Sequence, residues 1–94
     1  MRVIYKHAIE PLCETKIVFP EGSKIIHFDY QIDSLYLWAE IDIFNKDETR
    51  QFAVIGTGNP VIEDNWKYIS TCFDEEYCHG SIFVWHLYEV PFSI

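Results

Sequence analysis

The sequence predicts an all-β domain of about seven short antiparallel strands, arranged as a sandwich or a small barrel. Apolar and polar residues alternate with a period of two, which is typical of strands that bury one face. Turn-forming residues separate these runs, and no segment shows the periodicity of an amphipathic helix. With 94 residues, of which 49% are apolar, the chain fits a single domain spanning 1–94.

The first four strands are separated by turn signals in the N-terminal half. Pro11 divides the first apolar run from the second, which ends at Pro20. The step Asp33-Ser34 predicts a tight hairpin between the third strand and the fourth. We therefore expect strands at 3–9, 15–19, 24–32 and 34–44. Their clearest core faces are Ile26, Phe28, Tyr30 and Ile32 in the third, and Leu35, Leu37, Ala39, Ile41 and Ile43 in the fourth.

Three further strands are expected in the C-terminal half. Residues 50–57 are apolar on both faces, which indicates a central strand. Residues 66–73 and 81–90 are predicted to form a hairpin closed by 74–80. Because 81–90 is also apolar on both faces, it should lie in the middle of a sheet or be covered by a second copy of the chain. This edge argument predicts a homodimer that uses this strand or the residues Tyr36 and Trp38.

The charge balance restricts the class of partner. Seven Lys and Arg residues against 15 Asp and Glu residues give a formal net charge of −8. Such a chain repels phosphate, so we expect no direct contact with nucleic acid and none with an anionic membrane. No apolar run approaches the roughly 20 residues of a membrane span, and residues 1–12 lack the apolar core of a signal peptide. We therefore expect a cytoplasmic protein.

The cysteines predict neither a disulfide scaffold nor a metal site. Three cysteines are an odd number, whereas secreted disulfide scaffolds carry an even one. Cys72 and Cys78 flank the predicted acidic turn and would face each other across it, but in a reducing compartment we expect free thiols. Their spacing fits a structural zinc site poorly. No metal and no other cofactor is predicted.

The glycine-rich segment Gly56-Thr57-Gly58-Asn59-Pro60 has two interpretations. Its glycines would let backbone N–H groups approach a phosphate, as in anion-binding loops. Phosphate-binding loops of this kind lead into a helix, whereas here Glu63 and Asp64 follow and would repel an anion. The second interpretation is a turn that needs a positive φ at Gly58.

No catalytic residues are predicted. Three of the four histidines, His7, His27 and His86, fall inside predicted strands, where a histidine is most often a paired packing residue. Serine hydrolase signatures are absent. The chain is therefore not expected to be an enzyme.

An outward-facing aromatic pair is the main candidate for partner binding. Tyr36 and Trp38 share the polar face of strand 34–44 with two carboxylates, which is typical of an interface hot spot with an acidic rim. The alternative is that a second sheet or a loop covers this face. The acidic run at 74–76 is a second cluster, either merely solvated or part of the same site. The candidate partner-binding residues are Tyr36, Trp38, Glu40, Asp42, Asp74, Glu75 and Glu76.

The sequence also resembles a family of small uncharacterised phage and prophage proteins. The similarity covers nearly the whole chain and keeps the order and approximate spacing of its motifs. These motifs are residues 20–25 (PEGSKI), 37–39 (LWA), 50–52 (RQF), 56–61 (GTGNPV), 68–71 (YIST) and 84–89 (VWHLYE). The resemblance implies an accessory role in a phage context and carries over no catalytic or ligand residues.

The sequence is compatible with three candidate functions. The first is a non-enzymatic protein that binds and inhibits a host protein with a basic surface, such as a nuclease or another defence protein, in the host cytoplasm. Its carboxylates would take the place of phosphates, and acidic charge would speed association. The second is a structural accessory protein of the phage particle. The third is a sponge for a nucleotide signal, with ligand-binding residues Arg50, Gly56, Thr57, Gly58, Trp85 and His86.

Overall fold

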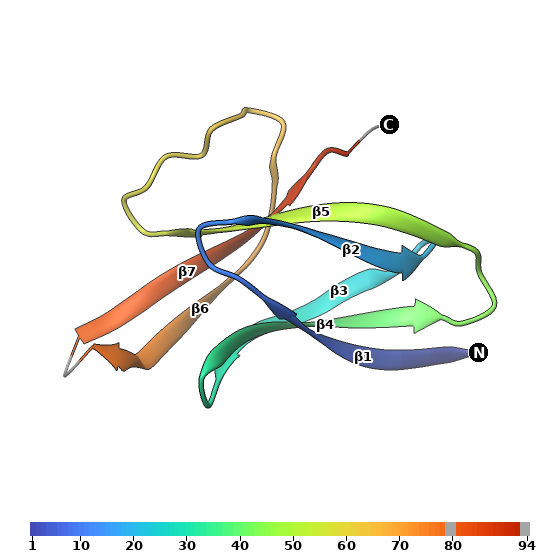
Figure 1. Cartoon of the computed structure of the whole chain (residues 1–94), viewed down its shortest axis with the longest axis horizontal. Helices are drawn as coiled ribbons and strands as arrows, with labels where there is room; N and C mark the ends of the chain where they lie inside the picture. Colours follow the sequence, from blue (N-terminus) through green and yellow to red (C-terminus); the bar gives the residue numbers. More distant parts are fainter. Residues whose placement is uncertain (79–80, 93–94) are drawn as a thin grey trace.

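The computed structural model describes residues 1–78 and 81–92, with the side chains of 1–74 and 83–92. Seven antiparallel strands form two packed sheets in this part of the chain (Figure 1). The same described residues include no helix that is long and apolar enough to cross a membrane. The strands are β1 (Arg2–Ile9), β2 (Glu14–Pro20), β3 (Lys24–Gln31), β4 (Ser34–Asp42), β5 (Asp47–Gly56), β6 (Lys67–Cys78) and β7 (Ser81–Val90).

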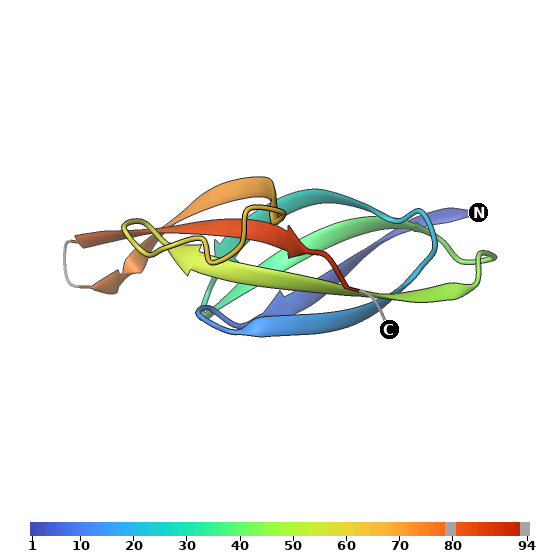
Figure 2. The same ribbon diagram turned by 90° about the horizontal axis from the view of Figure 1, so that it is seen from above.

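The strand order confirms the prediction of an all-β sandwich. One sheet has the order β1-β4-β3 and the other the order β2-β5-β7-β6, and the two do not close into a barrel. Figure 2 looks onto the four-stranded sheet, where the loop 57–66 crosses over β7 on its way from β5 to β6. The prediction of a central strand at 50–57 is confirmed by β5. The alternative that placed strand 81–90 inside a sheet is confirmed as well, since β7 lies between β5 and β6.

The core lies between the two sheets and follows the alternation in β4. Leu35, Leu37, Ala39 and Ile41 are all buried, while the residues between them lie on the opposite face. The predicted core position Ile43 is wrong, because β4 ends at Asp42 and Ile43 is 39% exposed. The largest fully buried apolar side chains come from both sheets, and they are Phe19, Phe28, Phe52, Leu37, Leu87 and Val54.

A bulge in β3 changes which of its residues reach the core. The register with β4 shifts between Ile25 and His27, so Ile25 packs against the core and Ile26 becomes exposed. Beyond the bulge, Phe28 is buried as expected. The predicted core positions Ile26 and Ile32 are wrong, because a bulge reverses the inward and outward sides of a strand and Ile32 lies in the turn.

Strand β6 is longer than the sequence predicted. The acidic segment expected as a turn at 74–80 continues the strand as far as Cys78, with Asp74 opposite Phe83 and Cys78 opposite Ser81. Residues 79–80 lie outside the described part of the chain. The prediction is wrong because β6 still pairs with β7 at Asp74 and Cys78, with a register shift between them, and an acidic composition alone does not exclude such pairing.

An ion pair joins β5 and β7 at the edge of the core. Arg50 donates two hydrogen bonds to Glu89, from Nε to Oε2 and from Nη2 to Oε1, each 2.7 Å long. A third donor, Nη1, bonds to the carbonyl oxygen of Ser23, and the guanidinium carbon lies within 6 Å of the Phe19 and Phe52 ring centres. The hydrogen bonds to Glu89 raise the pKa of Arg50. Arg50 therefore ties β5 to β7 and to the start of β3.

Candidate functional site

The predicted aromatic pair lies on the outer face of the three-stranded sheet. The ring centres of Tyr36 and Trp38 are 6.2 Å apart, and Lys6 Nζ lies 4.3 Å from the Tyr36 ring centre. The ring centre of His27 is 5.1 Å from that of Trp38. The other sheet packs against the opposite face of β4, so this face is not covered by it. Tyr36 and Trp38 are half-buried by neighbours on their own sheet.

The carboxylates beside this pair are balanced by nearby positive charges. Arg2 Nη1 lies 3.1 Å from Glu40 Oε1, and the Met1 ammonium lies 3.2 Å from Asp42 Oδ1. The backbone N–H of Phe44 donates to the same Asp42 oxygen and, together with the ammonium, lowers the pKa of Asp42. The predicted acidic rim is therefore largely neutralised on this face.

Asp74 occupies a different place from the one predicted. It is only 1% exposed and points to the inner side of β6, opposite Phe83. It therefore belongs to neither a solvated turn nor the face of Tyr36 and Trp38. The side chains of Glu75 and Glu76 lie outside the described residues. The structure thus does not place Asp74 beside Tyr36 and Trp38, as the predicted partner site required.

Instead, Asp74 lines a pocket of about 220 Å³ at one end of the sandwich. Here the end of β1, the β3–β4 turn and the overhanging strands β6 and β7 meet, on the left in Figure 1. The lining residues are Ala8, Ile9, Glu10, Pro11, Tyr30, Asp33, Ser34, Leu35, Asp74 and Trp85. Three of these are carboxylates and none is Lys, Arg or His. We refer to Glu10, Asp33 and Asp74 together as the acidic end.

The sequence held only a weak signal for this site. Glu10 and Asp33 stand in predicted turns that are 23 residues apart, where single acidic residues are common. The pocket forms because β1 pairs with β4, which places both turns at the same end of the three-stranded sheet. Sequence reasoning therefore missed Glu10, Tyr30 and Asp33.

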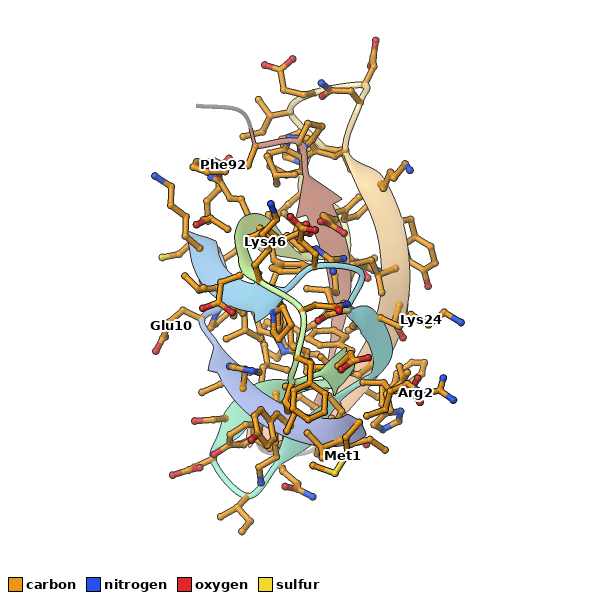
Figure 3. The ribbon with its side chains drawn as sticks, turned by 90° about the vertical axis from the view of Figure 1, so that its right-hand side faces the viewer. Met1, Arg2, Glu10, Lys24, Lys46 and Phe92 are labelled. Atoms are coloured by element: carbon orange, nitrogen blue, oxygen red, sulfur yellow. The ribbon has the colours of Figure 1, made fainter. Side chains whose placement is uncertain are left out.

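The opposite end of the molecule carries charges of both signs, since Glu21, Glu40, Asp42 and Asp47 lie there beside several cations. Figure 3 looks onto that end, which carries Met1, Arg2, Lys24 and Lys46. Strand β1 runs between the two ends, so roughly 25 Å separates them at 3.3 Å per residue. This distance exceeds the Debye length of about 8 Å in physiological salt, so the cations of the opposite end do little to screen the acidic end. Lys6 lies closer, because its Nζ donates to Gln31 Oε1 at the end of β3.

The proposed nucleotide-binding residues are only partly assembled. Thr57 and His86 meet on the outer face of the four-stranded sheet, whereas Trp85 faces the core and is 5% exposed. Arg50 is engaged by Glu89 and stands six residues from Gly56 along β5, which is about 20 Å in an extended strand. Arg50 and the glycine-rich loop therefore do not form one phosphate site.

The glycine-rich loop is held to the sheet by a chain of polar contacts. Gly58 has a φ of +94°, as the turn interpretation expected, and Asn59 N–H donates to the Gly56 carbonyl. The Thr57 hydroxyl lies 2.8 Å from His86 Nε2, and the Thr71 hydroxyl lies 2.9 Å from His86 Nδ1. Both ring nitrogens of His86 are thus engaged by threonines, which fixes the ring against the sheet.

The cysteines differ in their environments. Cys13 is an exposed free thiol, and Cys72 is a buried free thiol beside the core. Cys72 and Cys78 lie on the same strand, so the expectation that they face each other across a hairpin is wrong. Burial, with a smaller contribution from Asp29 and Asp74, raises the pKa of Cys72 to about 12.

We expect the two thiols to react at very different rates. At pH 8, iodoacetamide should modify Cys13 in the folded protein and leave Cys72 intact, because thiolate is the reactive form. Peptide mass spectrometry after timed quenching measures both rates, and modification in denaturant provides the control. Equal modification of Cys13 and Cys72 in the folded protein would contradict the assignment of Cys72 to the core.

The fold removes one of the two reasons for expecting a homodimer, the exposed edge of strand 81–90. Because β7 is central, it presents no edge that a second copy would need to cover. The homodimer stays a prediction, and it now depends on the face of Tyr36 and Trp38 alone.

Comparison with known proteins identifies the family of the chain. None of the curated proteins and none of the solved structures matches it. A family model described as a domain of unknown function, DUF7352, matches residues 1–93. That match spans almost the entire sequence, so the chain belongs to the DUF7352 family.

Proposed function

We propose that this protein is a non-enzymatic protein that binds a basic partner protein through its acidic end. In this proposal it is made by a phage, acts in the cytoplasm of the infected cell and inhibits its target by occupying a basic surface. Nucleic-acid-binding proteins, including nucleases, present such surfaces, and the exposed carboxylates of the acidic end, Glu10 and Asp33, would take the place of phosphates. The net charge of −8 favours fast encounter with a partner of this kind.

Two exposed apolar side chains beside the pocket carry this proposal. Leu12 is 65% exposed in the turn that follows Glu10, and Ile32 is 85% exposed in the turn that contains Asp33. Apolar side chains next to charged groups are typical of protein interfaces, where the apolar groups contribute affinity and the charges contribute specificity. A small-molecule site would instead enclose its apolar groups.

Both side chains are held in an unfavourable backbone conformation. Leu12 has a φ of +63° and Ile32 a φ of +60°, and these are the two positive-φ residues other than glycine in the described ranges. This region is disfavoured for residues with a Cβ atom, most strongly for β-branched ones such as isoleucine. Strain of about 1–3 kcal/mol per residue is a recurring feature of binding sites.

Replacing both residues by glycine separates binding from stability. The variant Leu12→Gly/Ile32→Gly should be at least as stable as the unaltered protein, because glycine adopts positive φ without strain. It should lose most of its affinity for the partner. A partner captured from bacterial lysate is first purified, and its affinity is then measured by biolayer interferometry between 50 and 500 mM NaCl.

The matched control is Phe44→Ser, which removes an exposed apolar side chain at the opposite end and should leave binding unchanged. The affinity of the unaltered protein should fall steeply as salt increases. A partner that binds the glycine variant with full affinity, or whose affinity does not depend on salt, would overturn the proposal.

A further inference from the structure

We propose that the free edge of β1 binds an extended segment of a partner protein as an additional antiparallel strand of the three-stranded sheet. The segment would alternate apolar side chains, which fill a groove between β1 and β2, with acidic ones, which lie beside the cations of β1. The inference is independent of the proposed function, because it concerns the open side of the sandwich and not its acidic end. Three observations support it: the free backbone groups of β1, the uncovered groove beside it, and the charge of the strand.

Strand β1 has one edge without a partner strand. It lies at the margin of its sheet and pairs only with β4 among the described strands (Figure 1). The N–H of Ile43 donates to the Met1 carbonyl oxygen. Because hydrogen-bonded pairs alternate along an antiparallel ladder, the odd-numbered residues of β1 bond to β4. The N–H and C=O groups that point away from the sheet are therefore those of Arg2, Ile4, Lys6 and Ala8. Neither proline nor a bulge interrupts this edge, so it can pair with another strand along its whole length.

The two sheets are packed together along one side and open along the other. On the closed side β3 packs against β6. On the open side a groove lies between β1 and β2, and its lining residues are Tyr5, His7, Val18, Phe19, Pro20, Ile41, Ile43 and Asp47. Its accessible apolar surface comes from Tyr5, Val18 and Ile43, which are 52%, 58% and 39% exposed.

Tyr5 shows that the inner face of β1 is left uncovered here. In the register with β4 it lies opposite Ala39, which is 0% exposed, so its side chain points to the inner face. Inner-face residues of a sandwich are normally buried by the facing sheet, whereas half of Tyr5 is accessible because the four-stranded sheet does not extend over it. The inward side chains of an added strand would lie beside Tyr5 and cover it. The three-stranded sheet would then have as many strands as the sheet it faces.

Strand β2 also has an unpaired edge, yet its inner side chains are already covered. Ile17 and Phe19 are 9% and 1% exposed, so a strand added to β2 would cover no apolar inner face. Main-chain hydrogen bonds are the same at either edge, so side-chain contacts decide which edge is used. These contacts favour β1.

Charge favours a foreign strand over a second copy of β1. Strand β1 contains Arg2 and Lys6 and neither Asp nor Glu, in a chain with 15 acidic residues. Two copies of β1 side by side would bring like charges together, which destabilises a ladder. A strand with carboxylates on its outer side avoids this repulsion. On the inner side, burial lowers the pKa of His7, so the ring is neutral at pH 7 and suits apolar neighbours.

The test uses the synthetic heptapeptide acetyl-TVEVEVT-amide as a probe. It is titrated into the 15N-labelled full chain while 1H–15N spectra are recorded. We expect a dissociation constant of about 0.1–1 mM, as for a short flexible peptide, with shifts confined to β1 and the groove. Hydrogen exchange at the amides of Ile4 and Lys6 should slow on binding, because these groups acquire partners, whereas the amide of Tyr5 is already bonded to β4.

N-methylation of the probe separates strand addition from simple hydrophobic attachment. In an antiparallel strand whose valines point inward, the glutamate N–H groups face β1 and the valine N–H groups face solvent. Methylation of both glutamate nitrogens should weaken binding at least about tenfold, because it removes two donors. Methylation of two valine nitrogens is the matched control and should weaken binding less than about twofold. A valine–lysine peptide of the same length should bind more weakly at about 150 mM NaCl, where the charge of the distant surface is screened.

Proline substitutions in the protein identify the edge. Ile4→Pro removes an N–H that points away from β4, a position where an edge strand tolerates proline, so the fold should persist while affinity for the probe falls at least about tenfold. The matched control is Lys16→Pro on β2. Its N–H also points away from the partner strand, because the bond from Glu21 N–H to the Lys46 carbonyl sets the same alternation there. It should leave probe binding unchanged. Tyr5→Thr, which keeps the backbone donors and removes the ring, should weaken binding about threefold or more.

Several outcomes would overturn the inference. They are the absence of localised shifts, equal effects of the two N-methylations, tighter binding of the lysine peptide, and loss of binding in Lys16→Pro but not in Ile4→Pro. Sedimentation supplies one more: a dimer that Ile4→Pro converts to monomer would show that a second copy occupies the edge. The Leu12→Gly/Ile32→Gly variant should bind the probe with full affinity, so this inference and the proposed function fail or hold separately.

Discussion

Replacing Glu89 with Gln should lower the free energy of unfolding by about 2–3 kcal/mol. The side chains of Arg50 and Glu89 are only 16% and 27% exposed, so the substitution leaves a largely buried guanidinium without its carboxylate. Removing one partner of a fully buried pair costs about 3–5 kcal/mol, and the residual exposure reduces that figure here. In a domain of this size the midpoint of thermal unfolding should fall by about 10 °C or more.

Two further variants separate the ion pair from general packing. The double variant Arg50→Met/Glu89→Leu should recover much of the loss, because apolar replacement of both partners leaves no buried charge. Glu40→Gln breaks the exposed pair with Arg2 and should change stability by less than about 1 kcal/mol. Urea denaturation measures all three. A Glu89→Gln variant as stable as the unaltered protein would contradict the structural role of the pair.

Replacing Phe52 with Ala should have the largest effect of all, a loss of about 3–5 kcal/mol. Phe52 is 0% exposed on the central strand β5, and its ring packs edge-on against Phe19 at 6.0 Å between centres. The substitution removes a large apolar side chain and leaves a cavity between the sheets. Since domains of this kind are stable by only about 5–15 kcal/mol, the variant should be marginal or unfolded at 37 °C.

The same substitution at Phe44 is the matched control for Phe52. Phe44 is 78% exposed in the turn after β4, so Phe44→Ala should change stability by less than about 0.5 kcal/mol. Both variants are compared by urea denaturation with circular dichroism. Similar losses for the two variants would show that Phe52 does not contribute to a core between the sheets.

The separation of stability from binding follows from where these residues lie. Phe52, Arg50 and Glu89 belong to the core and its edge, whereas Leu12 and Ile32 are exposed on strained turns. Changes in the first group should reduce folding and, through it, every activity. Changes in the second group should reduce partner binding while folding is preserved. Backbone strain lowers stability, so its presence at these two residues is expected if they serve binding.

The candidate site shows the limits of sequence reasoning most clearly. The outward direction of Tyr36 and Trp38 was predictable, because alternation in β4 depends only on neighbouring residues. The neutralisation of Glu40 and Asp42 was not, since it depends on the pairing of β1 with β4, which brings Arg2 and Met1 beside them. The acidic pocket likewise depends on the pairing of β1 with β4, and on β6 extending past the end of the three-stranded sheet.

Local sequence patterns were enough to predict the set of strands and most of their buried faces. A period of two, punctuated by proline and turn residues, is a local property, and it predicted seven strands and the central position of β5. The tertiary structure alone decided the bulge in β3, the extension of β6 through its acidic segment and the burial of Asp74. Each of these depends on pairing and packing between strands, whose hydrogen bonds and contacts outweigh the preference of a single segment.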